Sequence, residues 1–165
     1  MPPKKLFNSM ETTYSFHAFT EADIPRLSEL FKRYREVNPC RPQTDGHIYL
    51  SPAFDHGQYV LCADSADGRL AACAALYPQG DLTWANILID PAPSQEPWAL
   101  RGSLFNWLVN LAQQLGHSRL AFQRYPDETD SAAFLQSKGA KLAYYIYNLE
   151  RPLDLPIRSI DAPEG

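Results

Sequence analysis

The N-terminal third of the chain changes from a period of two to a helical hydrophobic pattern. Residues 13–19, TYSFHAF, alternate bulky with small or polar side chains, which predicts a half-buried strand. Apolar residues then recur at helical spacing up to Val37, and Thr20 with Asp23 resembles the capping box that begins many helices. The apolar positions of this predicted helix are Ile24, Leu27, Leu30, Phe31 and Tyr34.

The central part of the chain predicts a turn-rich segment followed by three strands. Residues 40–57 show little periodicity, which is common in segments that line binding sites. Residues 58–78, QYVLCADSADGRLAACAALYP, have two apolar runs around the turn SADG and predict a hairpin. Their Ala and Cys content indicates that another element packs closely against the sheet. Residues 82–89, LTWANILI, are almost continuously apolar, which predicts a central strand covered on both faces.

The C-terminal part alternates predicted helices and strands. A helix is predicted over residues 98–115, where apolar residues form one stripe, and Gly116 occupies the position that commonly ends a helix. The tail is rich in proline and acidic residues and is expected to be extended or partly disordered. The remaining expectations are a strand at 119–125, a helix at 129–138, a strand at 142–150, a flexible N-terminus at 1–12, a single domain at 13–152 and the tail at 153–165.

Composition argues against several classes of protein. The chain has 165 residues, enough for one domain with its own core, and 45% of them are hydrophobic. No apolar run approaches the roughly 20 residues that span a bilayer, so no membrane segment is expected. A net charge of −4 and a pI near 5.5 argue against nucleic-acid binding, which normally uses a basic surface.

The cysteines and histidines show no metal-ligand pattern. Cys40, Cys62 and Cys73 lack CxxC spacing, so neither a zinc site nor a disulfide framework is indicated, and no metal is expected. Together with an N-terminus that lacks a secretory pattern, this favours a cytoplasmic protein. Cys62 and Cys73 could face each other across the hairpin as buried thiols.

Five fragments, taken in order and with their spacing, carry a family resemblance: FHAFTEADIPRLSELF, AALYP, ILIDP, RGSLFNWLVNLAQQLG and DSAAFLQSKGAKLAYYIYNLE. Together they resemble the GNAT superfamily of N-acetyltransferases over residues 13–152. The resemblance implies an α/β fold with a mixed, splayed β-sheet and helices on both faces. It also implies that acetyl-CoA donates an acetyl or other acyl group to a primary amine of a small molecule or protein.

The resemblance implies that the central strand and the next strand diverge after Ile89 and admit the pantetheine arm of acetyl-CoA. Main-chain atoms of Ile87, Leu88 and Ile89 would pair with the pantetheine amides and polarise the thioester carbonyl. The amine would then attack the thioester directly, without a covalent enzyme intermediate.

By the same resemblance, the pyrophosphate would lie on backbone N–H groups at the start of the following helix, where Arg101, Gly102 and Ser103 are found. Arg101 is the strongest single candidate, because a guanidinium matches the geometry of a phosphate. The alternative for Arg101 is a salt bridge with Glu96.

Two features depart from the family pattern. The phosphate loop of the family reads R/Q-x-x-G-x-G/A, whereas PSQEPWALRGS retains only a glutamine and an Arg-Gly pair. Leu135 stands where the family often has a tyrosine that protonates the departing thiolate. The acid would then be water, Tyr144 or Tyr145. The alternative is a catalytically degenerate protein of this fold that binds a ligand or a partner without acyl transfer.

Several side chains are candidates for the base that deprotonates the amine. His47 and His56 lie in the turn-rich segment that would border the acceptor, although surface or packing roles explain them more simply. Asp81, Asp90 and Glu96 flank the central strand and could act through water, but acidic loop residues are usually just solvated. The base and the acceptor are therefore left open. A homodimer formed by edge pairing of the final strand is a further expectation.

Overall fold

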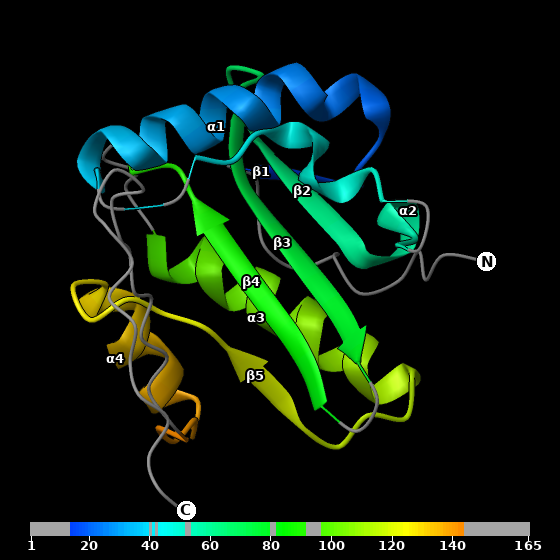
Figure 1. The fold of residues 1–165 in the computed structure, drawn as a ribbon, viewed down its shortest axis with the longest axis vertical. Coiled ribbons are helices and arrows are strands. Elements are labelled where there is room, and N and C mark those ends of the chain that lie inside the picture. Colours follow the sequence, from blue (N-terminus) through cyan, green and yellow to red (C-terminus); the bar gives the residue numbers. More distant parts are fainter. Residues whose placement is uncertain are drawn as a thin grey trace, which may run out of the picture. The chain divides into compact units, whose positions relative to one another are not determined.

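Five strands form one sheet in the computed structural model (Figure 1). They are hydrogen-bonded in sequential order, the first four antiparallel to their neighbours and the fifth parallel to the fourth. The strands are β1 (Tyr14–Ala18), β2 (Val60–Ser65), β3 (Leu70–Gln79), β4 (Leu82–Ile89) and β5 (Leu120–Phe122).

The described residues also form α-helices and short 3-10 helices. None of the helices in this part of the chain is both long and apolar enough to cross a bilayer. The α-helices are α1 (Ile24–Val37), α2 (His56–Tyr59), α3 (Pro97–Gln114) and α4 (Thr129–Ser137), and the 3-10 helices are η1 (Glu21–Asp23) and η2 (Gly46–Tyr49).

The structure describes residues 14–39, 41, 43–51, 54–79, 82–91 and 97–143. The chain divides into two compact units, Met1–Glu128 and Thr129–Gly165. The first unit carries the whole sheet with α1, α2 and α3, and the second carries α4. The flexible N-terminus, the tail and most of the final strand expected from the sequence lie outside the described residues.

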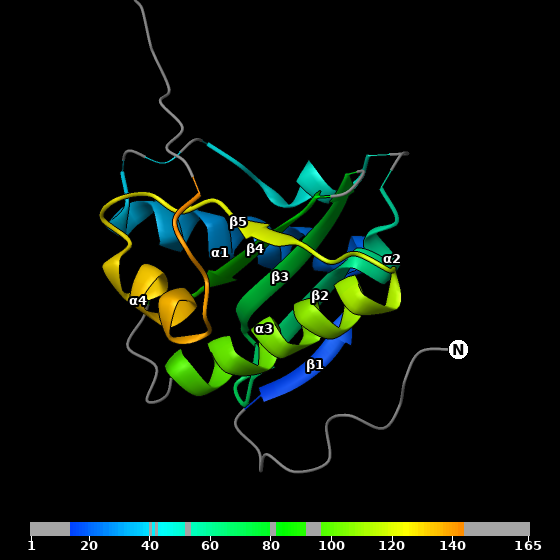
Figure 2. The ribbon, with the colours of Figure 1, turned by 90° about the horizontal axis from the view of Figure 1, so that it is seen from below.

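Alternate residues of β3 face opposite sides of the sheet, as the period of a strand requires. Ala72, Ala74 and Leu76 share a buried cluster with α3, whereas Cys73 and Ala75 share one with α1. The helices α1 and α3 therefore cover opposite faces of the sheet (Figure 2). This confirms the predicted α/β fold, a mixed sheet with helices on both faces.

The apolar stripe of α3 matches the small side chains on the strands beneath it. Leu100, Leu104, Leu108 and Ala112 recur every four residues and are at most 4% exposed. They pack on a sheet face that is mostly alanine, which allows the helix to approach closely. The helix ends at Gln114, one residue before the predicted end, and Gly116 follows with a φ of 79°, which suits a residue without a side chain.

Several boundaries differ from the sequence predictions. β2 begins at Val60 rather than two residues earlier, because Asp55 caps α2 by accepting a hydrogen bond from the backbone of Gln58. The segment predicted as turn-rich contains η2, and β5 ends at Phe122 rather than at residue 125. Residues 142 and 143, at the start of the predicted final strand, do not belong to a strand.

The two described cysteines meet as expected. Cys62 on β2 and Cys73 on β3 are direct partners in the strand register, and both are free, buried thiols. The hydrogen bond to Cys73, together with burial, raises the pKa of the Cys62 thiol well above its usual value. Cys62 is therefore a neutral core side chain rather than a reactive thiolate.

Gly46 provides a test of how η2 is held against α1. A Cβ at Gly46 would lie 2.5 Å from the carbonyl oxygen of Ile24, and neither backbone can move away cheaply. Gly46→Ala is therefore expected to lower the free energy of unfolding by about 1–3 kcal/mol, measured by urea denaturation. Gly57→Ala is the matched control, because its Cβ would come no closer than 3.6 Å to Asp55. Equal losses in the two variants would contradict this explanation.

Candidate active site

β4 extends beyond its parallel neighbour. The register pairs Thr83 with Leu120 and Ala85 with Phe122, and β4 then continues to Ile89 without β5 beside it. The sheet therefore opens after Ala85, which is earlier along β4 than the sequence analysis placed the divergence.

Along β4, alternate residues direct their main-chain N–H and C=O groups toward opposite neighbouring strands, which identifies the residues that face this opening. The backbone N–H of Thr83 donates to the carbonyl oxygen of Arg119 at 3.1 Å, so odd-numbered residues of β4 direct their N–H and C=O groups toward β5. Ile87 and Ile89 continue this series past the end of β5. Leu88 has the opposite parity and directs its main-chain groups toward Cys73 on β3.

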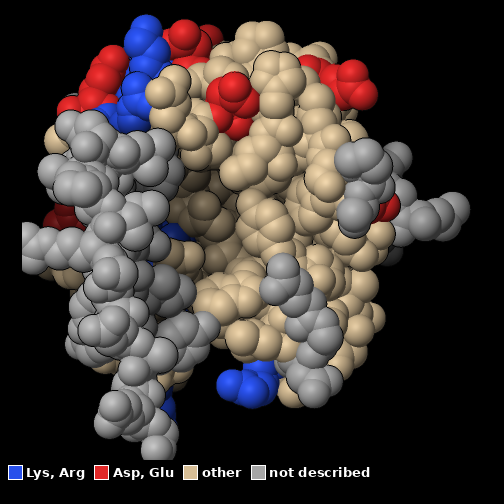
Figure 3. All heavy atoms as spheres, viewed as in Figure 1, with Lys and Arg blue, Asp and Glu red and all other residues tan. Residues whose placement is uncertain are grey.

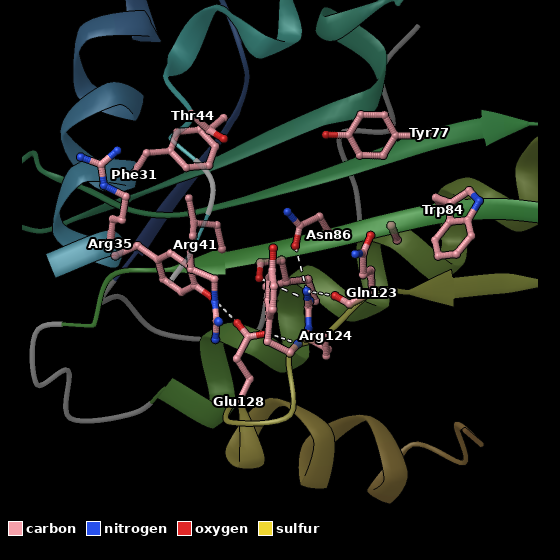
Figure 4. A pocket seen from close by; sticks show the side chains of 15 residues that line it. Phe31, Arg35, Arg41, Thr44, Tyr77, Trp84, Asn86, Gln123, Arg124 and Glu128 are labelled. Atoms are coloured by element: carbon pink, nitrogen blue, oxygen red, sulfur yellow. Dashed lines mark hydrogen bonds between the residues drawn. The ribbon is translucent and has the colours of Figure 1, made fainter. Parts of the chain in front are cut away.

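A cavity of about 330 Å³ lies beside the opening. The face of the molecule in Figure 3 is hollowed near its centre, where mostly uncharged side chains surround the hollow and basic atoms are visible at its edge. The cavity is lined by parts of α1, the segment between α1 and η2, β3, β4 and the segment after β5 (Figure 4). The lining residues used below are Tyr34, Arg35, Arg41, Asn86, Arg124 and Glu128.

Arg124 lies against the unpaired edge of β4. Its Nη1 donates to Oδ1 of Asn86 at 2.9 Å and to the carbonyl oxygen of Gln123 at 2.8 Å, and its Nη2 donates to the carbonyl oxygen of Ile87 at 3.4 Å. Its Nε is buried without an acceptor among the described residues. Burial lowers the pKa of Arg124, and the ion pairs within the described ranges do not include it. Arg124 is thus a partly buried cation that lacks a paired carboxylate in this part of the chain.

Glu128 is held from two sides. The hydroxyl of Tyr34 on α1 donates to Oε1, and the backbone N–H of Tyr125 donates to Oε2 at 2.9 Å. Burial and the hydrogen bond to Glu128 raise the pKa of Tyr34 to about 12, so the phenol stays protonated near neutral pH. The carboxylate therefore keeps one orientation at the cavity wall (Figure 4).

Arg41 forms another part of the wall. Its side chain is only 6% exposed, and its guanidinium stacks over the ring of Tyr125 at 3.7 Å from the ring centre. Its Nη2 donates to Asp127, whose side chain is 65% exposed, and its Nε has no acceptor within the described ranges. The stacking and the ion pair fix Arg41 between the segment before η2 and the segment after β5.

The residues predicted to bind acyl-CoA fall in two places. Ile87 and Leu88 line the cavity, whereas Ile89, further along β4, does not. Ile87 and Ile89 both pack on the α3 side of the sheet. Because α3 begins at Pro97, Arg101, Gly102 and Ser103 belong to its second turn, which does not line the cavity.

Within that second turn, the N–H groups are expected to bond to carbonyl oxygens of the first turn. The hydroxyl of Ser103 also donates to the carbonyl oxygen of Ala99 at 3.3 Å. A Cβ added at Gly102 would meet no atom within 4 Å, so the helix surface is open there.

The base candidates named from the sequence do not line the cavity. The ring of His47 lies 3.1 Å from the carboxylate of Asp45, and His56 packs edge-on against Phe19. Asp90 accepts hydrogen bonds from Arg33 at 2.9 Å and Arg69 at 2.8 Å, so it anchors the end of β4. The other candidates, Asp81, Glu96, Tyr144 and Tyr145, lie outside the described residues.

Sequence reasoning missed the polar residues that meet at the cavity. Glu128 and Arg124 belong to the run RYPDE, which is separated from the end of β5 by one residue. The sequence pattern places Tyr34 only on the apolar face of a helix. The one available signal was position, because polar residues that follow a strand of a parallel pair often face a ligand. Nothing local indicates that Tyr34 and Glu128, 94 residues apart, would be hydrogen-bonded.

A second cluster of titratable side chains lies outside the cavity. One ligand atom from each of His17, Asp23 and Cys62 falls within 4.8 Å of the others. Arg26 donates to Asp23 and, at 2.9 Å, to Asp64, so a cation already occupies the space between these carboxylates. The cluster is therefore explained as a charge network that joins β1, α1 and β2.

Comparison with solved structures identifies the fold. No family model and no curated protein matches the sequence. The GCN5-related N-acetyltransferase of Sphaerobacter thermophilus aligns with a TM-score of 0.68 and 16% identity, over 79% of this chain and 44% of its own. Diaminobutyrate acetyltransferase EctA of Paenibacillus lautus aligns with a TM-score of 0.63 and 10% identity, over 78% of this chain and 75% of its own. The ribosomal-protein-S18-alanine N-acetyltransferase of Escherichia coli aligns with a TM-score of 0.59 and 18% identity, over 76% of this chain and 76% of its own.

The protein therefore has the GNAT fold, that of the GCN5-related N-acetyltransferases, as the sequence resemblance predicted. The chain spans less than half of the length of the Sphaerobacter protein but about three quarters of the other two.

The pKa of Tyr34 predicts how stability depends on pH. A phenol whose folded pKa of about 12 exceeds the usual value of 10 stabilises the fold below pH 10, and this contribution is lost as the pH rises toward 12. The difference in free energy of unfolding between the wild type and Tyr34→Phe is therefore expected to be constant from pH 8 to 9 and to shrink by pH 11. Urea denaturation at each pH measures it, and a difference that does not change would show that Tyr34 ionises normally.

Proposed function

We propose that this protein is an acyl-CoA-dependent N-acyltransferase that transfers an acetyl group from acetyl-CoA to a primary amine. One observation carries the proposal: an unpaired β4 edge and an oriented carboxylate, Glu128, border the same cavity in a protein of GNAT fold. The S18-alanine N-acetyltransferase and the diaminobutyrate acetyltransferase, which share this fold, are named for amine acetylation.

The proposed donor site follows β4 and the start of α3. Ile87 and Ile89 would pair with the pantetheine amides through their main chains, and Leu88 would contribute its side chain. The aligned EctA structure contains coenzyme A together with its amine substrate, which supports a site of this kind.

The pyrophosphate would lie at the N-terminal end of α3. Arg101, Gly102 and Ser103 would face it from the second turn, and the helix dipole would add favourable partial charge. Arg101 would pair with a phosphate, since a guanidinium matches its geometry.

The proposed reaction is direct transfer. The amine nitrogen attacks the thioester carbon, a C–N bond forms, the C–S bond breaks, and coenzyme A leaves as a thiolate that takes a proton from water. Glu128 accepts the proton that the amine loses, since its carboxylate is held at the cavity wall by Tyr34 and the backbone of Tyr125. Polarisation of the thioester carbonyl by a β4 N–H would lower the barrier to attack.

A second candidate is a protein of this fold that binds a ligand without transfer. Two observations favour it: Arg124 already donates to the carbonyl oxygen of Ile87, and Leu135 stands where the family often has an acid. Calorimetric titration with acetyl-CoA, followed by an assay of thiol release with a panel of primary amines, separates the two. Binding without thiol release would support this second candidate.

Glu128→Gln tests the proposed base. The variant is expected to lower kcat for amine acetylation by about 100-fold or more, because an amide cannot accept the proton. The affinity for acetyl-CoA, measured by calorimetry, should not change. Glu29→Gln is the matched control, since Glu29 lies on α1 with a side chain 62% exposed and should not affect kcat. Similar losses of kcat in both variants would remove Glu128 from the mechanism.

Gly102→Ala tests the proposed phosphate site by two opposite effects. Alanine is the better helix former and meets no neighbour here, so the free energy of unfolding is expected to rise by about 0.5–1 kcal/mol. The added methyl group would obstruct the pyrophosphate, so the affinity for acetyl-CoA should fall. Thermal unfolding and calorimetry measure the two quantities. A more stable variant with wild-type affinity would place the phosphates elsewhere.

A further inference from the structure

The cavity contains more cationic than anionic side chains. Arg35, Arg41 and Arg124 line it, with Glu128 as the one carboxylate among the described lining residues. The excess is local, because the chain as a whole carries a net charge of −4. Positive charge gathered in a cavity of a net negative protein favours an anionic ligand there.

In two of these arginines one guanidinium nitrogen, the Nε, lacks a hydrogen-bond acceptor. The Nε atoms of Arg41 and Arg124 are both buried without a partner within the described ranges. A buried donor without an acceptor is costly, and the cost is higher for a charged group. Among the described carboxylates, Arg41 forms an ion pair only with the well-exposed Asp127, and Arg124 forms none. Each of these two Nε atoms could therefore donate to an oxygen atom of a ligand.

Arg124 and Glu128 belong to the same segment after β5, but they contact different elements. Arg124 lies against Asn86 of β4 (Figure 4) and donates to the carbonyl oxygen of Ile87. Glu128 accepts a hydrogen bond from Tyr34 of α1. A ligand in this cavity thus meets a cation beside β4 and an anion beside α1. A molecule with a carboxylate and an amine a few bonds apart satisfies both.

We infer that the acceptor is an amino carboxylate, an amino acid whose carboxylate pairs with Arg124 and whose amine faces Glu128. This inference rests on the proposed function and names the substrate class of the same site. Aromatic side chains from α1, β3, β4 and the segment after β5 complete the lining, so an acceptor with an aromatic or large apolar side chain fits best. The aromatic lining residues are Phe31, Tyr34, Tyr77, Trp84 and Tyr125.

The donor does not account for this excess of positive charge. The acetyl group is neutral, and the phosphates of acetyl-CoA are proposed to lie at the start of α3, which contributes no residue to the cavity lining. The thioester carbonyl requires a hydrogen-bond donor but not a full counter-charge. The anion is therefore assigned to the acceptor.

The first experiment compares acceptors that differ only in the carboxylate. Thiol release from acetyl-CoA is measured with L-phenylalanine, L-phenylalaninamide and 2-phenylethylamine. The wild type is expected to show a kcat/KM at least about 10-fold higher for L-phenylalanine than for either uncharged analogue, the effect of one charge-assisted contact. The amine of L-phenylalaninamide is less basic than that of L-phenylalanine, so more of it is unprotonated at neutral pH. This difference alone would favour the amide, which is the opposite of the expected result.

Arg124→Ala is expected to bring the ratio of kcat/KM for L-phenylalanine over 2-phenylethylamine close to one. A merely structural role would lower both values and leave the ratio unchanged. Arg119→Ala is the matched control, because Arg119 is an exposed arginine just before β5 that does not line the cavity. In Arg119→Ala the ratio of kcat/KM for L-phenylalanine over 2-phenylethylamine should equal that of the wild type.

A binding experiment separates this inference from the proposed function. The product analogues N-acetyl-L-phenylalanine and N-acetyl-L-phenylalaninamide are titrated calorimetrically in the presence of coenzyme A. If no amine releases thiol, the proposed transfer reaction fails, yet tighter binding of the anionic analogue by the wild type than by Arg124→Ala still supports the anion site. Equal or absent binding of the two analogues overturns the inference. A preference for succinyl-CoA over acetyl-CoA with 2-phenylethylamine also overturns it, because the anion then belongs to the donor.

Discussion

The site depends on one constraint of β-sheet geometry: β4 continues after its hydrogen-bonded neighbour β5 has ended at Phe122. A strand edge carries N–H and C=O groups that need partners once they are covered by protein. At Ile87 the partner is the side chain of Arg124 rather than another strand. The opening in the sheet is therefore polar on its β4 side, and an extended ligand with amide groups could take the same hydrogen bonds.

The opening is kept in place by packing on both faces of the sheet. α3 covers one face over small side chains, and α1 covers the other, so β3 and β4 are fixed between two buried clusters. At its end, β4 is anchored where Asp90 accepts hydrogen bonds from Arg33 on α1 and from Arg69 just before β3. A rigid support of this kind lets a few polar side chains keep their positions at the cavity.

The polar groups of the cavity form a connected arrangement rather than a set of separate residues. Tyr34 and the backbone of Tyr125 hold Glu128, while the ring of Tyr125 supports Arg41. Arg124 belongs to the same short segment and contacts β4. The segment after β5 therefore joins α1 to the open edge of the sheet, which places an oriented carboxylate beside a cation with no paired carboxylate among the described residues.

The sequence alone determined most of the elements, because their signals are local. The period of two over β1, the apolar run of β4 and the four-residue repeat of α3 each reflect which side chains a single element must bury. The order of these elements also indicated the GNAT fold and the strand that borders the opening. Tertiary structure alone decided where β5 ends and which polar residues meet. Arg41 and Asp127 are 86 residues apart and Tyr34 and Glu128 are 94 apart, and contacts over such distances arise from packing of the whole sheet, which leaves no periodic trace in the chain.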